Sequence, residues 1–169
     1  IFGGSIPREF IPAILKGFET SMTNGPLAGF PVESMRVRIF DGSFHQVDSD
    51  SMSFELCAKS GFREAGRKAK TVILEPIMKV EVTTPDQYMG DVTGDLNRRR
   101  AMLEGMDNRN NLQIIKAKVP LSEMFGYVTQ LRSLSSGRAT SVMEFSHYAN
   151  APRNIEEEVV AKTKGKFSN

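Results

Sequence analysis

Gly90-Asp91-Val92-Thr93 recurs as Gly126-Tyr127-Val128-Thr129, 36 residues further along the chain. Each copy follows an alternating apolar run that ends at a proline, Pro85 in the first copy and Pro120 in the second. Alternation indicates a strand, the proline ends it, and the residues that follow suit a helix that returns the chain to the sheet. Two such units side by side predict a βαββαβ sandwich. This architecture carries no catalytic site of its own, so function is sought on its surfaces.

The composition is that of a globular protein, since 40% of the 169 residues are apolar and 25% are charged. The net charge of +2 gives no global attraction for nucleic acid, so a basic surface has to be local. No apolar run reaches the about 18 residues of a membrane span, and we expect no membrane partner. The single Cys57 excludes an internal disulfide, and its apolar neighbours predict a buried side chain. Because the chain starts at Ile1 without an initiator methionine, we expect a fragment.

The first seventy residues predict two helices and a strand. An apolar stripe with helical spacing covers 11–24, and a second helix is expected from about Ser51 to Lys68, with a capping oxygen at its start. Between them, apolar and basic residues alternate over 34–40, which is typical of a strand with one basic face. The polar run from Asp41 to Ser51 indicates an exposed loop.

The second helix carries four cations at helical spacing: Lys59, Arg63, Arg67 and Lys70. Such a row is either a solvated helix face or a ridge that contacts phosphate groups. Near it in sequence, His45 lies in the middle of the polar loop beside Phe44. An exposed ring and imidazole flanked by cations can stack on bases and approach phosphates, and a surface histidine without a role is the alternative.

The sequence indicates two boundaries between structural parts. The helical pattern stops at 68–71, where we place the boundary between the first part and the duplicated part. After a last strand with Met143, Phe145 and His147 on one face, Ala151-Pro152 ends the duplicated part. Asn154 is then expected to cap a terminal helix, with Glu157 three residues on completing a capping box.

The sequence shows no pattern that predicts a catalytic site. Two histidines and one cysteine show no nucleophile–base spacing, and Asp48-Ser49-Asp50 lacks the glycine and distal glutamate of a calcium loop. No stretch matches the phosphate-binding loop of nucleotide hydrolases, so no cofactor is expected in this chain.

Two segments resemble the fourth domain of bacterial elongation factor G. They are the loop from Asp41 to Ser49 and the stretch Gly25-Pro26-Leu27-Ala28-Gly29-Phe30-Pro31-Val32. The runs at 74–82, 90–96, 120–127 and 131–134 are similar to the fifth domain of that family. The resemblance covers essentially the whole chain.

The resemblance implies an α+β protein in three parts. Residues 1–70 would be the C-terminal part of domain IV, a partial α/β half-domain like the second domain of ribosomal protein S5. Residues 71–150 would be domain V, a ferredoxin-like βαββαβ sandwich, and 151–169 a C-terminal helix and tail. The parent protein would be a cytoplasmic GTPase that uses GTP with Mg, bound by domains upstream of Ile1.

The family's activity supplies the expected partners. Domain IV of the family follows tRNA and mRNA into the decoding region of the ribosome during translocation, and domain V packs near ribosomal RNA and the stalk base of the large subunit. The residues expected to contact RNA or the ribosome are those of the tip loop and the basic helix: Asp41, Gly42, Ser43, Phe44, His45, Gln46, Lys59, Arg63 and Arg67. A paralogue that acts in ribosome recycling or ribosome protection is the alternative. The family's sheet includes strands before Ile1, so the 34–40 strand is expected to lack neighbours.

Overall fold

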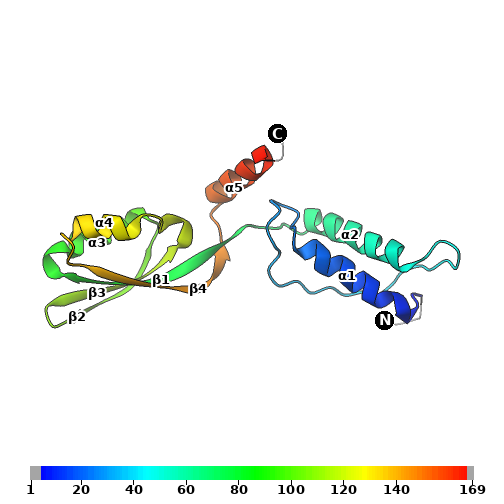
Figure 1. Ribbon diagram of the computed structural model, residues 1–169, viewed down its shortest axis with the longest axis horizontal. Coiled ribbons are helices and arrows are strands. Elements are labelled where there is room, and N and C mark those ends of the chain that lie inside the picture. Colours follow the sequence, from blue (N-terminus) through cyan, green and yellow to red (C-terminus); the bar gives the residue numbers. More distant parts are fainter. Residues whose placement is uncertain (1–4, 167–169) are drawn as a thin grey trace. The chain divides into compact units, whose positions relative to one another are not determined.

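The computed structural model describes residues 5–166, which form two compact units. One unit consists of residues 5–73 with 152–166, and the other of residues 74–151. Each unit is described by itself below, with the helices and strands labelled as in Figure 1. The α+β class predicted from the sequence is confirmed.

The unit of residues 74–151 is built on a four-stranded antiparallel sheet with the order β2-β3-β1-β4. Its strands are β1 (Leu74–Pro85), β2 (Met102–Arg109), β3 (Leu112–Pro120) and β4 (Thr140–Asn150). The helices are α3 (Met89–Arg98) and α4 (Tyr127–Leu134), each preceded by a short 3-10 turn, Asp86–Tyr88 and Leu121–Glu123. The predicted βαββαβ order is therefore confirmed.

Both helices lie on the same face of the sheet (Figure 1). Alternate residues of β1 and β3 turn towards them and are fully buried, as the period-2 geometry of a strand requires. In β1 these residues are Val80 and Val82, and they pack with the helix residues Val92 and Leu96. The alternation that predicted the strands is thus the alternation that builds the core.

The register between β1 and β4 is interrupted by a bulge that the sequence pattern did not show. Met78 of β1 pairs with Phe145 and Ile77 pairs with His147, which leaves Ser146 without a partner. Because successive β1 residues face opposite sides, His147 lies on the face opposite to Phe145. The expectation that Met143, Phe145 and His147 share one face is wrong for His147.

The other unit contains two helices that run side by side in the same direction, α1 (Ile11–Met22) and α2 (Ser51–Lys68) (Figure 1). A 3-10 turn, Arg8–Phe10, leads into α1. A small core of Ile6, Ile14 and Ala58 lies between the elements, with Phe10, Phe18, Ile39 and Phe54 packed against it. Both helices were predicted from the sequence, and α2 begins at the residue expected.

The strand predicted at 34–40 is wrong, because these residues form no ladder with any other segment among residues 5–166. Ile39 packs on the small core, but Met35, Val37 and Phe40 are exposed. An alternating sequence becomes a strand only when a neighbouring strand accepts its N–H groups. Residues 34–40 alternate as in a strand, but no segment of the described part of the chain pairs with them.

The terminal helix, α5, spans Arg153–Lys166, so the predicted capping box is wrong. Asn154 lies inside the first turn, and the carbonyl of Pro152 accepts the amide of Glu156 at 2.9 Å. Glu157 instead pairs with Arg153 at 2.9 Å, one helical turn earlier. The Glu156 carboxylate accepts the amide of Ile73, also at 2.9 Å, which ties the start of α5 to the end of the segment after α2.

We expect amides of 34–40 to exchange with solvent much faster than amides of 77–82 and 113–119. The first set makes no ladder hydrogen bonds in the described residues, whereas both other sets lie in paired strands. Hydrogen exchange followed by mass spectrometry or NMR measures all three sets in one sample. Equal protection in a monomeric sample would show that the first unit is closed without further strands.

Candidate functional site

The tip loop is built on a close crossing of α1 and α2. At Gly17, a Cβ atom would lie 2.6 Å from the carbonyl oxygen of Glu55 and 2.7 Å from the Ala58 Cβ. Only glycine allows this approach, because real Cβ atoms do not come so near to backbone oxygen. The crossing holds the first turns of α2, which the loop enters at Ser51, against α1.

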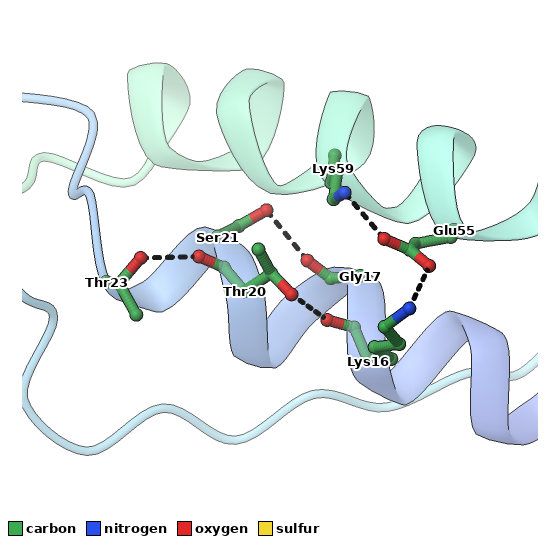
Figure 2. A network of polar contacts seen from close by, with 7 residues as sticks. All are labelled: Lys16, Gly17, Thr20, Ser21, Thr23, Glu55 and Lys59. Carbon is green, nitrogen blue, oxygen red and sulfur yellow. Dashed lines mark hydrogen bonds and ion pairs between the residues drawn. The ribbon is translucent and has the colours of Figure 1, made fainter. Parts of the chain in front are cut away.

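A shared carboxylate reinforces the crossing on its surface (Figure 2). Glu55 of α2 accepts from Lys59, one turn further on, at 2.6 Å and from Lys16 of α1 at 3.1 Å. The two ammonium groups, with Lys59 the stronger influence, lower the pKa of Glu55 from its ordinary value. Lys59 is therefore engaged within the protein.

The hydroxyl groups of α1 turn back onto their own helix. Thr20 donates to the carbonyl of Lys16 and Ser21 donates to that of Gly17, each at 2.8 Å (Figure 2). Side chains bonded in this way offer less to an outside ligand. The hydroxyl groups of Thr20 and Ser21 therefore already have hydrogen-bond acceptors within α1.

The start of α2 is fixed by Asp50, which supplies the capping oxygen expected in the run 48–51. Its carboxylate accepts the amide of Ser53 at 2.7 Å, which satisfies one of the free N–H groups of the first turn. This amide, followed by the Ser53 hydroxyl, lowers the pKa of Asp50 from its ordinary value. The cap defines where the loop ends and the helix begins.

The tip of the loop is a tight turn over 45–49. The carbonyl of His45 accepts the amide of Ser49 at 3.0 Å, and the Ser49 hydroxyl accepts the amide of His45 at 3.0 Å. His45, Gln46 and Val47 all face solvent, and Val47 is 94% exposed. The turn is held by the backbone and one hydroxyl, so the side chains at its tip are free to meet a partner.

Phe44 is placed differently from the other tip residues. Its ring lies 5.6 Å from that of Phe10, which in turn stacks on Phe54 at 4.8 Å. The ring is half-buried in this aromatic row and anchors the loop to the helix pair. Stacking on a base, which the sequence suggested for an exposed Phe44, would require it to leave the row.

Gly42 and Asp41 lie at the base of the loop. A Cβ at Gly42 would meet the Ile6 side chain at 2.3 Å, so the loop backbone rests directly on the small core. The Asp41 carboxylate accepts the amide of Gly42 at 2.8 Å, and Ser43 is exposed. These residues shape the loop, while the outward groups of His45 and Gln46 form its tip.

Of the four cations predicted to form a row on α2, two lie on the helix without an ion-pair partner among the described side chains. Lys59 is engaged by Glu55, and Lys70 lies beyond the end of α2 with a positive φ of 45°. Arg63 and Arg67 are exposed, and neither forms an ion pair within the part of the chain whose side chains are described. They are the cations of this helix that can reach a phosphate group.

Cys57 is exposed, so its predicted burial is wrong. The buried face of α2 passes through Ala58 and Phe62, and Cys57 lies on the neighbouring outward face. The apolar residues next to Cys57 in the sequence do not show which side of the helix faces the core. The buried residue that the sequence left undecided between Gly61 and Phe62 is Phe62.

Within the described residues, no three His, Cys, Asp or Glu side chains gather closely enough to hold a metal ion. Across residues 5–166, no helix combines the length and the apolar character that crossing a bilayer demands.

Two protein-family models match the chain. Residues 1–70 match the model described as elongation factor G, domain IV, and residues 72–159 match the model described as elongation factor G C-terminus. The chain belongs to the elongation factor G family. The resemblance found in the sequence is thereby confirmed.

Individual relatives of the elongation factor G family support this. The elongation factor G of Amoebophilus asiaticus is 61% identical over 165 residues, and that of Cytophaga hutchinsonii is 63% identical over 165 residues. These alignments cover 98% of this chain but 23% and 24% of the two relatives, so the chain spans about a quarter of their length. A crystal structure of a protein from Thermus thermophilus is similar with a TM-score of 0.87 and 35% identity, over 97% of this chain and 25% of that one.

The helix crossing yields a matched pair of glycine variants. Gly17→Ala is expected to destabilise the first unit by about 2 kcal/mol, because overpacking costs about 1–3 kcal/mol. Gly61→Ala, also inside a helix but with open space around it, is expected to stabilise by up to about 1 kcal/mol. Hydrogen exchange of the α2 amides reports this unit separately from the other. A stable Gly17→Ala variant would show that the helices separate easily at the crossing.

The cap of α2 yields a pH-dependent prediction. Asp50→Ala is expected to destabilise the first unit at neutral pH, whereas Asp50→Asn keeps an oxygen for the Ser53 amide and costs less. Because folding lowers the pKa of Asp50 below 3.8, the charged cap stabilises fully above about pH 5 and this contribution is lost as the pH falls through the folded pKa. Unfolding followed at pH 7 and pH 3 measures both effects. The Asn variant should lack this part of the pH dependence, and an unchanged profile in it would assign the dependence to other groups.

Proposed function

We propose that this chain is the ribosome-binding arm of a translation elongation factor that promotes GTP-dependent translocation of tRNA and mRNA. The observation that carries the proposal is the exposed tip at 45–49, held on a glycine-fixed helix pair in a chain of the elongation factor G family. A tip that must enter a crowded RNA site gains from a rigid base and free outward side chains.

The proposed roles follow from the contacts in the first unit. His45 and Gln46 carry the polar groups that meet the mRNA–tRNA duplex, and Arg63 and Arg67 contact phosphate groups. Asp41, Gly42 and Ser43 set the path of the loop, and Phe44 anchors it through Phe10. Lys59 serves the helix crossing through Glu55 rather than RNA.

The wider setting is part of the same proposal. Residues 1–70, 71–150 and 151–169 act as the end of domain IV, domain V and a C-terminal helix, in a cytoplasmic protein. Ribosomal RNA, the A-site tRNA with mRNA, and the stalk base of the large subunit are the partners, together with upstream domains of the same protein. GTP and Mg belong to those upstream domains, because this sequence contains no phosphate-binding loop to hold them.

His45→Ala in the parent factor is expected to slow single-turnover translocation roughly 5- to 150-fold, which corresponds to loss of a contact worth about 1–3 kcal/mol in the transition state. GTP hydrolysis should stay nearly unchanged, because the nucleotide is bound outside this chain. The substitution keeps the His45 amide that Ser49 accepts, so the turn itself should persist.

Lys68→Ala is a suitable control for the tip variant. Lys68 is exposed near the end of α2 and pairs with Glu64, one turn earlier. Its removal should leave the translocation rate within experimental error. Unchanged translocation in His45→Ala, measured beside a normal Lys68→Ala variant, would contradict the proposed role of the tip.

A further inference from the structure

A groove runs between α1 and α2 on the outer surface of the helix pair. Its volume of about 590 Å³ falls within the about 300–1,000 Å³ that is usual for ligand sites. Its floor is apolar, because α1 contributes Pro12 and Ala13 and α2 contributes Met52 and Leu56. Met52 is 70% exposed and Leu56 is 56% exposed. Neighbouring apolar side chains that are exposed and line one hollow are typical of a docking surface.

The groove lies on the side of α2 that faces away from the small core. Phe54 and Ala58 face that core, and Leu56 lies two residues from each of them, which is about 200° around an α-helix. Ile39 packs on the same core, so the 34–40 segment also lies on that side. A strand paired with 34–40 would extend that side and leave the groove uncovered. The exposure of the groove is therefore a separate feature of the helix pair.

One end of the groove is positively charged. Lys16 and Lys59 are the last lining residues of their helices, and both bind the carboxylate of Glu55, the one acid among the lining residues (Figure 2). Because a single carboxylate neutralises one of two ammonium groups, a net positive charge remains. The side chain of Lys16 is 69% exposed, against 32% for Lys59. An ammonium group has three donors, so Lys16 has the capacity to bind a second carboxylate supplied by a partner.

The shape and lining of the groove favour a protein helix over RNA. The lining residues of α2 extend from Ser51 to Lys59, which is about 12 Å at about 1.5 Å per residue. This length matches two turns of a helix laid along the groove, with two apolar side chains one turn apart on its lower face. None of the lining residues is aromatic, so the groove has no ring on which a base could stack.

We propose that this groove binds an amphipathic helix of another protein. The helix carries two apolar residues one turn apart, which contact Met52 and Leu56, and an acidic residue one turn beyond them, which pairs with Lys16. The site is separate from the tip at 45–49 and does not depend on the RNA contacts proposed for that tip. Binding requires both the apolar floor and the charge at its end.

The test is a titration of the isotope-labelled 169-residue chain with designed peptides, followed by NMR. The main peptide is a capped alanine–glutamine helix of about 18 residues that carries two leucines one turn apart and a glutamate one turn before and after them. It should bind with a Kd below about 1 mM and shift the amides of 12–16 and 51–59. Replacing its leucines by glutamine should abolish binding, and replacing its glutamates by lysine should weaken binding at least about 2-fold.

Variants of the chain locate the site. Leu56→Gln should weaken binding of the main peptide at least about 10-fold, because a buried leucine contact is lost. Lys16→Gln should weaken it about 2- to 5-fold and reduce the preference for glutamate over lysine in the peptide. Leu15→Gln is the matched control, since Leu15 is 48% exposed on α1 but does not line the groove. It should leave the affinity unchanged, and equal weakening in Leu15→Gln and Leu56→Gln would contradict the proposal.

Other occupants of the groove give distinct results. Shifts of the same amides when the chain is diluted without peptide would make the groove an interface between two copies. A single-stranded uridine oligonucleotide that shifts them when the main peptide does not would make it an RNA site. Binding of the main peptide to the chain but not to the parent factor would show that another segment of the parent protein fills the groove.

Each of these results overturns the proposal, as does failure of the main peptide to bind the chain. The outcome is independent of the proposed function. Unchanged translocation in His45→Ala together with the expected peptide binding would contradict the role of the tip and leave the groove proposal standing.

Discussion

The pairing of β1 on both of its edges is the constraint on which the 74–151 unit depends. Val80 lies opposite Ala117 of β3 and opposite Met143 of β4. A slip of β3 by one residue would turn its buried residues Ile115, Ala117 and Val119 to the other face of the sheet. With the register fixed, one face of the sheet must be covered, and both α3 and α4 lie there (Figure 1). The corner between β3 and α4, which carries Phe125, is placed by the same pairing.

Arg99 then connects this core to the surface. Its partner Asp95 is 6% exposed, and a buried carboxylate is costly unless it is paired and hydrogen-bonded. The same guanidinium orders the Glu123 and Phe125 carbonyls, so the group that neutralises a buried charge also shapes an exposed loop. Arg100 works in parallel, with two bonds to Glu75 of β1 and one to Glu123. A lysine could not replace either residue, because it lacks the planar set of donors.

The sequence predicted those elements whose partners are also in the chain. The duplicated unit was predicted because β1 and β3 each supply the other's neighbour, and the alternation of their residues is matched across the pair. The 34–40 segment has the same alternation without a neighbour among residues 5–166, and it forms no strand. Three other features were not predicted because they depend on backbone geometry that residue types alone do not show. They are the bulge at Ser146, the side of α2 on which Cys57 lies, and the Pro152 carbonyl that starts α5. At the candidate site, the exposure of His45 could be predicted, but the Phe10–Phe44 contact could not, because the two rings are far apart in sequence.

The loop at 45–49 and the loop around Phe125 differ in how their conformation is fixed. The 45–49 turn has few backbone bonds and one anchoring ring, so its exposed side chains can change conformation, and ordering them on a ligand would cost entropy. The Phe125 loop is fixed by a buried ion pair and packed residues on both sides, so it suits a partner whose shape stays constant. The loop around His45 can therefore change conformation more easily than the loop around Phe125, whose backbone is held by Arg99.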